Sequence, residues 1–166
     1  MFSRKNKPSP KKIFVIALLA FLALVPARLF ARDTSIAVVV NPNNPAESVT
    51  LAYLRNIFLG TQQFWKDGSP VVPVLRAPSA RERDVLLRQI VHMSEAKFQD
   101  YWNKKRGVRN PIVVVSNGMQ LELVAKEAGG IALVATSDLH SGVKVLKVAG
   151  HMPGSAAYPL KSASAR

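Results

Sequence analysis

Two patterns of hydrophobic and polar positions alternate along this chain. One is typical of buried strands and the other of amphipathic helices. Residues 36–41 read IAVVVN, and this continuous β-branched run predicts a strand buried on both faces. Residues 71–75 predict another strand, in which Pro73 favours an irregular or edge segment. Further strands are expected at residues 112–115, 131–135 and 143–148.

The segments between these runs have helical spacing and recognisable ends. Thr50 is placed to cap a helix over residues 51–59, and Gly60 follows where a left-handed residue is wanted. Residues 79–82 read Ser-Ala-Arg-Glu, the form of a capping box, and predict a helix from about 80 to 91. Two more helices are expected at residues 95–105, opened by Ser94, and at residues 119–128.

The alternation of strands and helices predicts an α/β fold. We expect a three-layer sandwich with a mostly parallel central sheet and helices on both faces. In such sheets ligands bind beyond the carboxyl ends of the strands, where helix N-termini converge. The chain places Asn41, Arg76–Arg81 and Ser116–Gly118 at those ends.

The N-terminus has the order of a secretory signal. Five basic residues precede an apolar run over residues 13–25, and small residues ending at Ala27 or Ala31 follow. The run has 13 residues, whereas a membrane-spanning helix needs about 20. We therefore predict a cleaved signal peptide over residues 1–31, one domain over 32–150, and a loosely ordered tail over 151–166.

Charge and cysteine content narrow the choice of compartment and partner. The formal charge is +13, but six of the 23 basic residues lie at or before the cleavage region, which leaves +7 from residue 32 onward. This excess favours anionic ligands, although a basic face kept for solubility explains it equally well. The chain has no cysteine, so it cannot be a lipoprotein, and a freely diffusing periplasmic protein is expected. The sequence lacks the interleaving of aromatic and basic residues that would indicate a nucleic acid partner.

Two predicted helix starts are candidate anion sites. Ser79, Ala80 and Arg81 can offer amides and charge to an oxyanion, while Arg76 adds a fork of donors. The alternative is that Ser79 only caps its helix and that both arginines are solvated. Ser116 and Asn117 form the second start, where the alternative is an N-cap with Asn117 paired to Gln120.

Motifs of catalysis are missing from the sequence. His92, His140 and His151 lie far apart and lack a second ligand at a metal-binding spacing. No Ser-His-Asp order, paired carboxylates or phosphate loop is found. We expect no enzyme, no metal site and no cofactor.

Three segments, in conserved order over about residues 36–148, resemble the substrate-binding proteins of phosphate ABC transporters. They are LAYLRNIFLG with WKDG at residues 51–60 and 65–68, then residues 71–76 with Ser79, and AGGIALV at 128–134. The resemblance implies one lobe of a type II periplasmic binding protein. It also implies ligand roles for Arg76 and Ser79, although the family's Gly-Ser-Gly-Thr turn is absent here.

The resemblance implies an exported periplasmic protein that recognises a small, phosphate-like oxyanion without covalent chemistry and serves a membrane transporter or envelope protein. An alternative is a ligand-free envelope interaction module that has lost the anion pocket. The chain is about half the length that two lobes need, and whether two copies form a homodimer with a rebuilt cleft stays open.

Overall fold

A computed structural model describes residues 34–162, so the signal peptide expected at 1–31 lies outside the described residues. The strands are β1 (Thr34–Val40), β2 (Ser48–Val49), β3 (Val72–Arg76), β4 (Ile112–Val114), β5 (Gly130–Ala135), β6 (Lys144–Val148) and β7 (Lys161–Ser162). The helices are α2 (Leu51–Phe58), α3 (Arg81–Val85), the π-helical η1 (Leu86–Val91), α4 (Glu95–Lys104), α5 (Asn117–Lys126) and the short 3-10 helix η2 (Thr136–Asp138).

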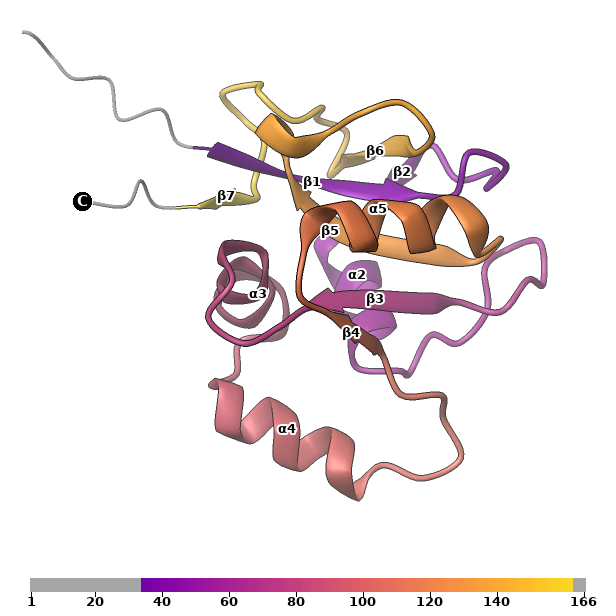
Figure 1. Cartoon of the computed structure of the whole chain (residues 1–166), viewed down its shortest axis with the longest axis vertical. Coiled ribbons are helices and arrows are strands. Elements are labelled where there is room, and N and C mark those ends of the chain that lie inside the picture. Colours follow the sequence, from indigo (N-terminus) through magenta and orange to yellow (C-terminus); the bar gives the residue numbers. More distant parts are fainter. Residues whose placement is uncertain (1–33, 163–166) are drawn as a thin grey trace, which may run out of the picture. The chain divides into compact units, whose positions relative to one another are not determined.

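One mixed sheet organises these elements (Figure 1). Its strand order is β2-β6-β1-β5-β3-β4, and β7 pairs with the start of β1. The strand pairs β3–β4, β3–β5 and β2–β6 are parallel, whereas β1 is antiparallel to both β5 and β6. The mostly parallel sheet predicted from the sequence is confirmed, with β1 as the strand that runs the other way.

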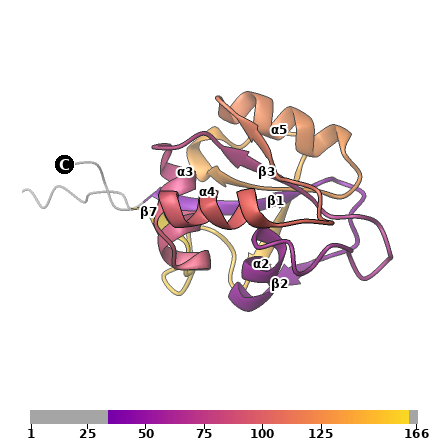
Figure 2. The ribbon, with the colours of Figure 1, turned by 90° about the horizontal axis from the view of Figure 1, so that it is seen from below.

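Helices cover both faces of the sheet, and α5 lies on the face opposite α2 (Figure 2). Alternate residues of β1 supply both cores: Ile36, Val38 and Val40 join the cluster that contains Phe58 of α2, and Ala37 and Val39 join the α5 cluster. This burial on both faces is what the continuous apolar run of β1 predicts.

Three helices begin as predicted, with a hydroxyl that caps the first turn. The side-chain oxygens of Thr50, Ser94 and Ser116 accept from the backbone amides of the residues three positions later. Gly60 after α2 has a φ of 65°, and a Cβ there would lie 2.6 Å from the Trp102 ring. The end of α2 therefore requires glycine for both its backbone and its packing.

The expectation that Pro73 marks an edge or irregular segment is wrong, because β3 lies between β5 and β4. Val72 donates its amide to Gly129 at the β5 side, so the nitrogen of Pro73 faces the other side. Pairing with β4 begins only at Val74, opposite Ile112. The proline thus removes no donor that the sheet uses.

The tail expected to be loosely ordered is packed as far as Ser162, so that expectation is wrong for residues 151–162. Tyr158 is 1% exposed and donates its hydroxyl hydrogen bond to the carbonyl of Ile36, 2.9 Å away. Leu160 is fully buried and its carbonyl accepts from the Ile36 amide. Tyr158 and Leu160, the two buried apolar side chains of this segment, anchor it against the start of β1.

Within residues 34–162, no helix is both long enough and apolar enough to cross a membrane.

Candidate functional site

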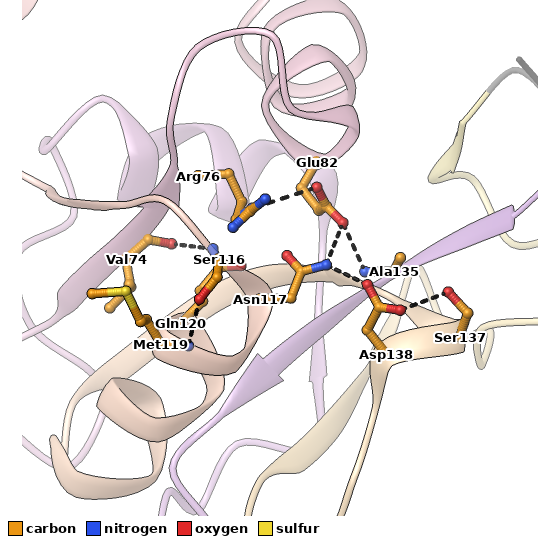
Figure 3. A network of polar contacts seen from close by, with 10 residues as sticks. All are labelled: Val74, Arg76, Glu82, Ser116, Asn117, Met119, Gln120, Ala135, Ser137 and Asp138. Atoms are coloured by element: carbon orange, nitrogen blue, oxygen red, sulfur yellow. Dashed lines mark hydrogen bonds and ion pairs between the residues drawn. The ribbon is translucent and has the colours of Figure 1, made fainter.

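Three strands end at one edge of the sheet and bring polar residues together there (Figure 3). Arg76 is the last residue of β3, Ser116 follows the end of β4, and Asp138 lies in η2, directly after β5. The strands β3, β4 and β5 are parallel, so their carboxyl ends meet as expected. Arg76, Ser116 and Asn117, singled out from the sequence, are gathered at this edge.

Arg76 is mostly buried and incompletely paired. Its side chain is 15% exposed, and its Nε lies 3.8 Å from Oε2 of Glu82, beyond hydrogen-bond distance. Both Nε and Nη1 are buried without a hydrogen-bond partner among the described residues. Since guanidinium donors without a partner are costly to bury, an oxygen acceptor that reached these two nitrogens would be stabilising.

Glu82 connects three elements at this edge. Its side chain is 5% exposed, and its Oε1 accepts from the Ala135 amide at 3.3 Å and from Asn117 Nδ2 at 3.1 Å. The carboxylate thereby joins α3 to the end of β5 and to the start of α5.

Asn117 completes the polar network. Its Nδ2 also donates to Asp138 Oδ2, and Ser137 donates to the other oxygen of Asp138 at 3.1 Å. Its Oδ1 is buried without a donor among the described residues and lies on the side of the amide that faces Arg76 (Figure 3). The site therefore presents unused donors on Arg76 and one unused acceptor on Asn117.

The second helix start has the N-cap given as the alternative in the sequence analysis, but not the pairing of Asn117 with Gln120. Ser116 caps α5 by accepting from the Met119 amide at 3.2 Å. Gln120 is buried and donates to the carbonyl of Val74 at 2.8 Å, so the expected pairing of Asn117 with Gln120 is wrong. The carboxylates of Glu82 and Asp138 are stronger acceptors for the Asn117 amide than another neutral amide is.

The capping box predicted at Ser79 is also wrong. The N-cap of α3 is Ala80, whose side chain makes no capping bond, and Ser79 has a left-handed φ of 70° in the preceding turn. The Glu82 side chain points into the network and not back to the helix start, because its carboxylate accepts hydrogen bonds from Ala135 and Asn117. Ser79 and Arg81 are exposed, and neither is in the network that contains Arg76.

Asn41 lies at the opposite end of the strands, beside the start of β5. Since β1 is antiparallel to β5, its carboxyl end lies beside Gly130, at the start of β5, and Asn41 donates its side-chain amide to the carbonyls of Val124 and Ala125. The structure therefore separates Asn41 from the other candidates and gives it a contact with the end of α5.

Sequence reasoning missed Glu82 as a network residue, and it missed Asp138. Asp138 follows a predicted buried strand, so the rule that places ligands beyond strand ends could have found it. Glu82 carried no such signal, because its partners lie 35 and 53 residues away.

Chemically, the network offers unpaired donors and one unpaired acceptor to a small polar group. Its charges are one guanidinium and two carboxylates, Glu82 and Asp138. Residues 34–162 contain no group of three or more His, Asp or Glu side chains able to hold a metal ion.

Comparison by sequence finds no matching family model and no matching curated protein. Solved structures do match. An ABC-type phosphate transport receptor from Vibrio cholerae aligns with a TM-score of 0.66 at 20% identity, over 78% of this chain and 54% of its own. PstS from Borrelia burgdorferi aligns with a TM-score of 0.64 at 18% identity, over 78% of this chain and 55% of its own.

A third structure, from Clostridium perfringens, is assigned as a phosphate ABC transporter substrate-binding protein and holds bound phosphate. It aligns with a TM-score of 0.61 at 23% identity, over 72% of this chain and 47% of its own. The fold is thus that of one lobe of these binding proteins, and the family resemblance read from the sequence is confirmed at the level of the fold. The chain spans about half the length of the structures it matches.

Proposed function

We propose that this chain is an exported solute-binding-like protein of the phosphate-transporter type, which recognises a small oxyanion at Arg76 and Asn117. The observation that carries the proposal is the pair of buried Arg76 nitrogens without a partner, at the sheet edge where this fold binds ligands. The similarity to a structure with bound phosphate supports the choice of ligand class.

The proposed binding mode uses both unpaired groups. Oxygens of the anion accept from Arg76 in fork geometry, and a protonated oxygen donates to Oδ1 of Asn117. Hydrogen phosphate can do both, whereas sulfate at neutral pH carries no proton to donate. The arrangement therefore favours phosphate over sulfate.

Two features limit the affinity. Glu82 and Asp138 place two negative charges within the same network as Arg76, and they repel an incoming anion. A single lobe also leaves a bound ligand exposed to water on one side. We expect salt-sensitive binding with a dissociation constant near 1 mM, corresponding to about 4 kcal/mol. A membrane transporter, an envelope protein or a second copy that closes over the edge would strengthen it.

Export is the second part of the proposal. The basic, apolar and small-residue order at residues 1–31 supports processing after Ala27 or Ala31 and release into a periplasm. Mass spectrometry of the chain recovered from the envelope fraction tests this part. A species that retains Met1 in the membrane fraction would contradict it.

One observation favours a different class of function, a ligand-free envelope interaction module. Glu82 already lies against Arg76, and Asn117 is held by two carboxylates, so the network can be read as a structural replacement for a lost ligand. Melting curves in phosphate and in chloride of equal ionic strength separate the two functions. A rise of the melting temperature specific to phosphate supports oxyanion binding, and equal curves support the module.

A further inference from the structure

The last strand of the sheet, β4, has one edge open in the part of the chain that the structure describes. Its only strand neighbour there is β3. Val114 accepts from the Ala77 amide at 2.9 Å, so its main-chain groups face β3. Because main-chain groups alternate along a strand, those of Val113 face outward, away from the sheet, and the chain bends at Val115, directly after the strand. The amide and carbonyl of Val113 are therefore open to another strand.

Apolar side chains accompany this open edge. Val113 on β4 is 55% exposed, and Val115, directly after the strand, is 74% exposed. Natural edge strands are kept from further pairing by charged side chains, by proline or by shortness. β4 has three residues and follows Pro111, but it carries no charged side chain, so its exposed apolar side chain is open to a partner.

A groove of about 260 Å³ runs between this edge and α4. Leu75, Phe98, Pro111 and Val113 contribute apolar walls. Two lining residues carry buried donors without a hydrogen-bond partner in the described part of the chain, Nη1 of Arg83 and Nε1 of Trp102. Arg83 is 5% exposed and Trp102 is 8% exposed, so both side chains belong to the buried part of the lining. An acceptor on an inserted side chain would satisfy them.

The loop that leads from α4 into β4 is basic. It carries Lys105, Arg106 and Arg109, and within residues 34–162 none of the three has an ion pair. A segment with acidic residues complements this loop, whereas a second copy of this net basic chain does not.

We propose that the β4 edge and the adjoining groove bind an extended, acidic and apolar segment of a partner protein by strand addition. The main chain of the segment pairs with Val113, an apolar side chain enters the groove, and carboxylates lie near Arg109 and the donors of the groove. None of the residues that line the groove belongs to the network around Arg76, so this proposal does not depend on the oxyanion proposal.

A fluorescein-labelled heptapeptide of alternating glutamate and valine is a suitable probe for the purified chain. Fluorescence polarisation should show saturable binding. Val115→Glu and Arg109→Glu should each weaken it at least about fivefold, because they add negative charge beside the acidic segment. Met152→Glu and Lys147→Glu are matched controls: Met152 is an exposed apolar residue, Lys147 is an exposed basic residue, and neither lies on β4 or α4, so both variants should bind like the unaltered chain.

Nitrogen-proton correlation spectra locate the contact. The indole signal of Trp102 and the amides of Val113 and Val115 should move with peptide. The indole of Trp65 should stay, because it donates to the Gly129 carbonyl at 3.0 Å. A peptide methylated on its alternate amide nitrogens should lose binding, and neither phosphate nor Arg76→Ala should change it.

Three results would overturn the proposal: equal binding by the Val115 and Arg109 variants, equal binding by the N-methylated peptide, or protection of the Val113 amide by self-association in the absence of peptide. The second would show charge attraction alone, and the third would show that another copy of the chain covers this edge.

Discussion

The guanidinium Nε of Arg76 lies 3.8 Å from the Oε2 of Glu82, so the two side chains form an ion pair without a hydrogen bond. The Glu82 carboxylate thus lowers the net charge near Arg76 but accepts no hydrogen bond from the guanidinium. An incoming oxyanion has to compete with this carboxylate, and the competition is electrostatic.

Glu82→Gln should therefore strengthen oxyanion binding. The amide oxygen of glutamine can still accept from Ala135 and Asn117, while the negative charge is removed. We expect about a five- to tenfold lower dissociation constant for phosphate, roughly 1 to 1.4 kcal/mol, by calorimetric titration. Glu122→Gln is the control, since Glu122 is exposed on α5 and pairs with Lys126. An unchanged affinity in Glu82→Gln would mean that phosphate binds elsewhere.

The core of the fold should depend on Phe58. This side chain is fully buried between α2 and the sheet, so Phe58→Ala should cost about 3 to 5 kcal/mol of unfolding free energy. Phe64 is 55% exposed, and Phe64→Ala should change the stability by less than about 1 kcal/mol. Chemical denaturation of both variants measures the difference. Similar losses would show that α2 packs differently.

Acid should weaken a specific tertiary contact between α3 and α4. Arg83 donates to Glu95 through Nε at 2.9 Å and through Nη2 at 2.7 Å, and this bonding lowers the pKa of Glu95 below its ordinary value of 4.5. A lowered pKa in the folded state contributes stability that is present above pH 4.5 and is lost as the pH falls through the folded pKa.

Glu95→Gln should accordingly be less stable by about 1.5 to 3 kcal/mol at pH 7, because charge-assisted bonds are lost from a buried arginine. The gap between the variant and the unaltered chain should narrow below pH 4.5. Denaturation at pH 7 and pH 3.5 tests this. A gap that stays constant with pH would show that the Glu95 charge does not contribute.

The C-terminal segment should stabilise the domain. Burial raises the pKa of Tyr158, which keeps its hydroxyl protonated as the donor to Ile36. Tyr158→Phe removes one buried hydrogen bond and should cost about 1 to 3 kcal/mol, since it leaves the Ile36 carbonyl without that donor, while Tyr158→Ala should cost more. Ser155→Ala provides a control in an exposed part of the same segment. A loss no larger than that control would show that the segment is not anchored.

Local sequence signals predicted most of the elements, because the hydroxyl caps and the β-branched runs act within a few residues. Thr50, Ser94 and Ser116 cap the helices that they precede, and both faces of β1 are buried. These features need only the spacing of neighbouring residues, which a sequence displays directly.

The errors concern contacts between distant segments. Because β1 runs antiparallel to β5, Asn41 lies at the other end of the strands from Arg76. No signal in the neighbouring residues gives the direction of a strand. The predicted capping box at Ser79 does not form, because the Glu82 carboxylate accepts from Ala135 and Asn117 and not from the helix start. Tyr158 reaches Ile36 across 122 residues, which its own Ala- and Ser-rich surroundings do not indicate.

Calorimetric titration of phosphate into the unaltered chain and into Arg76→Ala tests the central claim most directly. The account predicts weak, salt-sensitive binding near 1 mM in the unaltered chain, at least about tenfold weaker binding in Arg76→Ala, and weaker binding of sulfate than of phosphate. Arg55→Ala, a variant at an exposed arginine on α2, should bind like the unaltered chain. Phosphate binding that is the same with and without the Arg76 side chain would contradict the account.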